Sequence, residues 1–202
     1  MTRTLGRGLA RCLRKLGRSR IADAAEGAPL YFAGTVVSDG AGVRAPLSGR
    51  PCLAYDLEVV VGLDHLSRLH REGRGVDFLV SDGSGAKALV LLGSDRGPIQ
   101  RLSGHEVRQS LDDVDATRPE MARLLARPEI ADHVGALVTS PLCLERVLVS
   151  RDHVAVAGVG RWEPDVAPDT STSAWPGYRD APRMLVVRSG KELALIVTDE
   201  VA

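Results

Sequence analysis

The stretch DFLVSDGSGAKALVLL, residues 77–92, carries the clearest fold signal in the chain. Two apolar runs flank four turn-forming residues, Asp82 to Gly85, which is the pattern of a β-hairpin. Upstream, CLAYDLEVVV at residues 52–61 has apolar side chains at all its odd positions, with Asp56 and Glu58 on the other face. That alternation predicts a half-buried strand with one face in water.

Working outward from these two segments, the same criteria predict further strands and one helix. Strands are expected at 30–37, 142–149 and 153–159, with a weaker one at 106–111, a helix at 118–126, and a closing hairpin made by 184–187 and 193–197. Residues 62–75 are predicted as a polar, basic loop or short helical excursion, and 163–182 as an exposed loop. Because this order is not βαβ, we expect a mainly β (α+β) fold, an OB-like small β-barrel or sandwich with short helical insertions and an N-terminal amphipathic helix.

The N-terminal segment is strongly basic, although the whole chain is neutral. Residues 1–22 hold seven cations and no acid, so the other 180 residues hold 19 basic and 26 acidic side chains. This split predicts a basic helical arm, residues 1–26, on an acidic β-rich domain, residues 27–202. The helix is expected over 3–21, where apolar side chains recur at helical spacing among cations. The leucines are Leu5, Leu9, Leu13 and Leu16, and the cations are Arg3, Arg7, Arg11, Arg14, Lys15 and Arg18.

A basic face opposite a leucine stripe is typical of a helix that lies on an anionic membrane or in a groove of a partner protein. We therefore assign these ten residues as the membrane- or partner-binding set. The alternative is that the arm folds back on the domain as a solvated helix.

Composition excludes several other classes of protein. Three separated cysteines (Cys12, Cys52 and Cys143) without a CxxC pair favour neither a disulfide framework nor a zinc site, so we expect no metal and a reducing cytoplasm. No apolar run approaches a membrane span, and cations interrupt any secretory signal pattern. An acidic domain with seven aromatic residues also argues against specific nucleic-acid binding.

A motif within the strands resembles a known family. The run Ala45-Pro46-Leu47-Ser48-Gly49-Arg50-Pro51-Cys52 is followed by Tyr55, by the hairpin, and by Glu145–Val149 and Val154–Gly158. This pattern resembles the GIDE ("beside-a-membrane") domain family, found next to the RING finger of mitochondrial E3 ubiquitin ligases and in bacterial members beside membrane helices. The resemblance covers roughly residues 20–200.

The resemblance implies an OB-like module near a membrane that recruits or contacts proteins, here as a bacterial-type, stand-alone version. Ubiquitin transfer depends on a separate RING finger, which three isolated cysteines cannot build, so no enzymatic activity and no cofactor are expected. The family motif Pro46, Leu47, Ser48, Gly49, Cys52 and Tyr55 is either a contact loop or a turn that sets strand register, and Pro, Ser and Gly favour the turn.

Together these observations predict a non-catalytic, membrane-proximal protein-interaction module that docks by its basic helix. It would be cytoplasmic and peripheral at the inner face of the membrane, with an unidentified protein partner. The alternatives are a soluble oligomerisation or complex-forming subunit without lipid contact, a homo-oligomer included, and an OB-like nucleic-acid binder.

Overall fold

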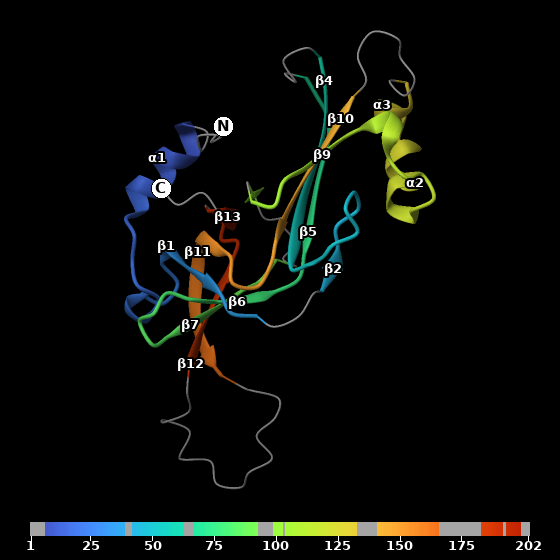
Figure 1. The fold of residues 1–202 in the computed structure, drawn as a ribbon. Helices are drawn as coiled ribbons and strands as arrows, with labels where there is room; N and C mark the ends of the chain where they lie inside the picture. Colours follow the sequence, from blue (N-terminus) through green and yellow to red (C-terminus); the bar gives the residue numbers. More distant parts are fainter. Residues whose placement is uncertain are drawn as a thin grey trace, which may run out of the picture.

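Five strands of this mainly β chain close into a barrel (Figure 1). The computed structural model describes residues 7–38, 42–62, 67–92, 99–102, 104–132, 141–165, 183–191 and 193–198. The barrel strands, in spatial order, are β1 (Pro29–Val36), β6 (Phe78–Ser81), β7 (Lys87–Val90), β12 (Arg183–Arg188) and β11 (His153–Pro164). β1 pairs with β11 to close the ring, and β7–β12 is its one parallel pair. This is an OB-like Greek-key barrel, so the predicted fold class is confirmed.

Long insertions between barrel strands build a second, four-stranded antiparallel sheet. Its order is β5-β4-β10-β9, and the chain enters it once after β1 and again after β7. The strands are β4 (Ala54–Val61), β5 (Ser67–Gly75), β9 (Val107–Ser110) and β10 (Leu142–Leu148). The remaining elements are β2 (Val43–Arg44), β3 (Pro51–Cys52), β8 (Ile99–Arg101), β13 (Ile196–Thr198), α1 (Arg7–Leu16), α2 (Pro119–Leu125), α3 (Pro128–Ala131) and the 3-10 turns Ile21–Asp23 and Leu111–Asp113.

The β4–β10 pair contributes to the two largest hydrophobic clusters. At one end Ala54 pairs with Leu148, and both pack in the barrel core around Phe32 and Phe78. Further along, Leu57 and Val147 pack in a second core beneath α2, α3 and the turn at 111–113. Because one ladder enters both cores, the barrel and the second sheet form a continuous body.

Several sequence expectations are corrected. Residues 67–75, predicted as loop or helix, form β5, an edge strand whose many charges hid the alternation that marks a half-buried strand. The strands β12 and β13 do not pair with each other as a hairpin, because both pair with β11. Asp56 and Glu58, expected in water, are only 2% and 5% exposed. The strand at 52–61 is therefore buried on both faces.

The N-terminal segment is packed onto the barrel. α1 ends at Leu16, where Gly17 takes a φ of +68°, so the helix is shorter than the predicted 3–21. The Ile21 side chain is fully buried in the barrel core, and its backbone N–H donates to Asp82 Oδ2 at 2.7 Å. The predicted boundary between an arm (1–26) and a domain (27–202) therefore does not separate two packing units, because Ile21 of the arm is part of the barrel core. Residues 166–182, most of the expected exposed loop, lie outside the described residues.

Gly34 tests the close approach of β1 and β6. A Cβ there would overlap the Ser81 carbonyl, whose carbon lies 2.8 Å away. We expect Gly34→Ala to lower the free energy of unfolding by about 1–3 kcal/mol, since backbone must move to admit a methyl group. Thr35→Ala, on the same strand, should cost less than about 1 kcal/mol. Urea unfolding monitored by circular dichroism measures both, and equal losses would contradict the packing argument.

Candidate functional site

The motif turn at 46–48 is held by a buried carboxylate. Glu145, on β10, is fully buried, and its Oε2 and Oε1 accept the backbone N–H groups of Leu47 and Ser48 at 2.5 Å and 3.0 Å. Arg118 Nη1 donates to the Leu47 carbonyl at 2.8 Å, and Gly49 adopts a φ of +70° that suits glycine. Because the N–H groups of Leu47 and Ser48 are already bonded to Glu145, the geometry of the motif suits a structural turn.

The two cysteines of this region are poor nucleophiles. Cys52 and Cys143 are buried and unpaired with each other. Burial, with the nearby Glu145 carboxylate, raises the pKa of the Cys52 thiol to about 11 and that of Cys143 to about 12. Since the thiolate is the reactive form, both side chains act as small packing groups at neutral pH.

Tyr55, the last motif residue, lies at a small hollow between β4–β5 and α2. Its hydroxyl donates to Glu72 Oε1 at 2.7 Å, and burial together with this bond raises the pKa of Tyr55. The hollow has a volume of about 60 Å³. Its lining residues are Pro46, Tyr55, Leu57, Glu72, Arg74, Glu120, Arg123, Leu124 and Arg127.

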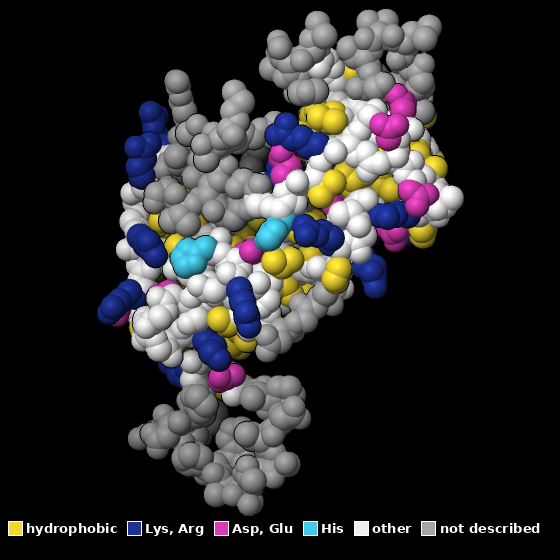
Figure 2. All heavy atoms as spheres, viewed as in Figure 1, with side chains coloured by type: hydrophobic (Ala, Val, Ile, Leu, Met, Phe, Trp, Pro, Cys, Tyr) yellow, Lys and Arg dark blue, Asp and Glu magenta, His cyan; other side chains and the backbone are white. Residues whose placement is uncertain are grey.

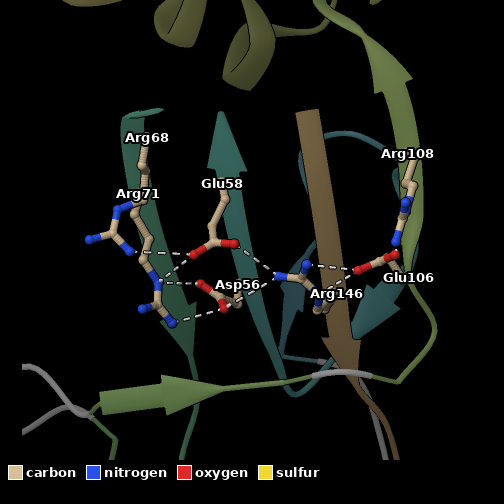
Figure 3. Close-up of polar contacts among 7 residues, drawn as sticks. All are labelled: Asp56, Glu58, Arg68, Arg71, Glu106, Arg108 and Arg146. Atoms are coloured by element: carbon tan, nitrogen blue, oxygen red, sulfur yellow. Dashed lines mark hydrogen bonds and ion pairs between the residues drawn. The ribbon is translucent and has the colours of Figure 1, made fainter. Parts of the chain in front are cut away.

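The opposite face of the four-stranded sheet carries a row of alternating charges (Figure 3). Arg71, on β5, donates through Nε and Nη2 to the two Asp56 oxygens, at 2.9 Å each. Arg146, on β10, donates to Glu58 Oε2 at 3.2 Å and to Glu106 Oε2 at 2.7 Å. The row therefore runs from β5 across β4 and β10 to Glu106, the residue before β9, with carboxylates between guanidinium groups.

Burial makes these interactions structurally important. Arg146 is only 4% exposed, and Asp56 and Glu58 are similarly covered. Burial raises the pKa of Asp56 against the opposing effect of Arg71. For Glu106 burial also acts upward, but the hydrogen bonds from Arg108 and Arg146 outweigh it and lower its pKa. The stability that Glu106 contributes is therefore present above its ordinary pKa of 4.5 and lost as pH falls below it.

The predicted binding helix α1 divides its two faces between the barrel and solvent. Leu13 is 1% exposed and packs with Tyr31, Ala33 and Ala155, while Leu16 is partly buried beside them. Leu13 is thus occupied by the protein's own sheet, which corrects its assignment to a membrane or partner contact. Arg3 and Leu5 lie outside the described residues, and the side chains of Arg7 and Leu9 are not described.

The described cations of α1, Arg11, Arg14 and Lys15, are exposed, and so is Arg18, two residues past the helix. In Figure 2 basic side chains line the margin of the molecule over this helix. Within the described part of the chain, no helix has the length and apolar character needed to cross a bilayer.

The three described histidines lie apart from one another, each beside its own polar partners. His105 Nε2 lies 3.1 Å from Asp152, and His153 Nδ1 lies 3.2 Å from the Thr35 hydroxyl. His70 lies 3.6 Å from Glu129 and 3.7 Å from Glu72. Among the residues that the structure describes, no group of three or more His, Cys, Asp or Glu side chains is arranged to hold a metal ion.

Sequence reasoning overlooked Glu145 and Arg146. Both lie in an otherwise apolar run, LCLERVL at 142–148, and a charged pair inside a predicted strand was the available signal. Their partners are 40 to 98 residues away, so only the strand register reveals them.

No family model, curated protein or solved structure matches the chain.

Thiol reactivity tests the burial of Cys52 and Cys143. In a Cys12→Ser background, we expect DTNB at pH 8 to react with either thiol at least about 100-fold more slowly in the folded protein than in urea. When the pKa rises from 9.0 to about 11, the thiolate population of Cys52 at pH 8 falls about 100-fold, and the rate of the reaction falls with it. Reaction of the folded protein at the unfolded rate would contradict it.

Arg146 tests the charge row. Arg146→Met should lower the free energy of unfolding by about 3–5 kcal/mol, because Glu58 and Asp56 would stay buried without their central cation. Arg108, whose side chain is 62% exposed, pairs with the same Glu106, so Arg108→Met is a matched control that should cost less than about 1 kcal/mol. Similar losses in urea unfolding would mean that burial does not set the strength of the row.

Proposed function

We propose that this chain is a non-catalytic, GIDE-like interaction module that rests on an anionic membrane surface and presents its β-rich body to a protein partner. The observation that carries the proposal is the basic outer face of α1, with Arg11, Arg14, Lys15 and Arg18 exposed at one margin of a body with net negative charge. Each cation near an anionic leaflet contributes about 1 kcal/mol, and the attraction falls with salt.

The packing of Leu13 defines the mode of docking. Because this leucine fills a buried position against β1 and β11, inserting it into lipid would empty that position and expose Ala33 and Ala155. The proposed contact is therefore electrostatic, with α1 lying on the headgroups while its apolar side stays on the barrel. Such a contact is weaker and more salt-sensitive than an inserted amphipathic helix.

A non-catalytic role is supported by the chemistry of the motif region. The thiols of Cys52 and Cys143 have raised pKa values, and the N–H groups of Leu47 and Ser48 are bonded to Glu145. These groups hold the second sheet together, which suits a rigid body that displays surfaces to other molecules.

Vesicle flotation tests the docking face. The full chain should float with anionic vesicles at low salt and not at high salt or with neutral vesicles. Arg11→Glu/Lys15→Glu should weaken binding by roughly 30-fold or more, about 1 kcal/mol for each lost cation. The matched control is Arg161→Glu/Arg183→Glu, which makes the same change of net charge on exposed positions of β11 and β12.

The control double variant should bind as the parent does. If both double variants lost vesicle binding equally, binding would depend on the net charge of the chain and not on α1. Absence of flotation by the parent chain on anionic vesicles would contradict membrane docking.

A further inference from the structure

Among the described residues, no strand pairs with the outer edge of β5. In the order β5-β4-β10-β9 this strand pairs with β4. An edge strand presents a row of backbone N–H and C=O groups that a further strand can join. β5 runs from Ser67 to Gly75, which makes it the longest strand of this sheet.

This edge is basic. The strand carries Arg68, Arg71 and Arg74 against a single acid, Glu72. The side chains of Arg68 and Arg74 are 51% and 64% exposed, so they remain in contact with solvent. Figure 3 shows Arg68 and Arg71 projecting from β5 on the face that bears the charge row. A strand joining this edge would meet positive charge on both faces.

The hollow at Tyr55 opens beside the same strand. Arg74 of β5, Arg123 of α2 and Arg127 all line this hollow, together with the apolar side chains of Leu57 and Leu124. Arg74 and Arg123 each lie 3.8 Å from a neighbouring carboxylate, and Arg127 donates a long hydrogen bond of 3.5 Å to Glu72. Because each guanidinium carries five N–H donors, this arrangement can accept one more carboxylate.

We propose that the outer edge of β5 binds an acidic, extended segment of a partner protein by strand addition, with one of its carboxylates in the hollow. This inference rests on the proposed interaction role. It specifies that the partner's binding segment is extended and acidic. Charged residues on an edge strand often serve only to prevent pairing. The adjoining hollow is lined by three arginines and two glutamates, Glu72 and Glu120, and this excess of positive charge is what favours selective binding of acidic strands here.

The test uses the full chain and a fluorescein-labelled, end-blocked peptide of alternating Val and Glu. Fluorescence anisotropy should show saturable binding of this peptide and none of a Val–Lys counterpart. Arg74→Ala and Arg127→Ala should each weaken binding about tenfold, the loss of one charge-assisted contact. Arg161→Ala, an exposed arginine on β11, is the matched control and should bind as the parent does.

Two N-methylated peptides test strand addition itself. One carries methyl groups on the Val nitrogens and the other on the Glu nitrogens. Only one set of N–H groups can face β5, so one peptide should bind like the parent peptide and the other should not. Equal binding of both would overturn strand addition, and equal binding of the acidic and basic peptides would overturn the charge argument.

Two further readouts separate this inference from the docking proposal. Arg74→Ala should float with anionic vesicles as the parent chain does, so a failure of peptide binding with intact flotation rejects the β5 site alone. Light scattering should show a monomer. A dimer that the acidic peptide does not dissociate would assign the edge to a second copy of the chain and overturn the inference.

Discussion

The β4–β10 ladder is the interaction on which the rest of the structure depends. It runs from Ala54–Leu148 in the barrel core to Val60–Leu142 at the far end of the second sheet. The two strands come from different insertions into the barrel, so their pairing joins chain segments that are about 90 residues apart. On one face the ladder carries Glu145 to the motif turn, and on the other it places Arg146 between carboxylates.

This ladder also explains how a strand with charged alternate positions can be buried on both sides. A carboxylate removed from water is tolerated only where a cation and hydrogen bonds replace its hydration. Arg71 supplies them to Asp56 from the neighbouring strand, and Arg146 supplies them to Glu58 from the other side. Removing one partner from this row would leave a buried charge without compensation.

Features that depend on residues near in sequence could be predicted, and features that depend on residues far apart in sequence could not. The hairpin at 77–92, the strands β1, β10 and β11, and the helix near residue 120 depend on local periodicity and turn residues, and they were predicted. β5 was missed because a charged edge strand lacks apolar alternation, although its register on β4 is well defined. The burial of Asp56 and the role of Glu145 could not be predicted from the neighbouring sequence, because strand pairing creates the environment of both residues.

The N-terminal helix was predicted from its sequence, but the surface that it packs on was not. Its amphipathic pattern was recognised, but the pattern alone does not say which surface the leucines cover. The structure packs Leu13 on Tyr31 and Ala155, so the helix is part of the body and its cations form the outward face. The OB-like barrel expected from the GIDE resemblance is present, and the proposed membrane contact depends on those cations.

Hydrogen–deuterium exchange of the full chain, with and without anionic vesicles, tests the central claim most directly. Residues 11–16 should keep their protection when vesicles bind, because Leu13 stays packed on the barrel while the exposed cations meet the headgroups. Faster exchange at β1 and β11 beneath the helix, with α1 protected only by lipid, would show that the helix leaves the barrel and inserts, which contradicts the account.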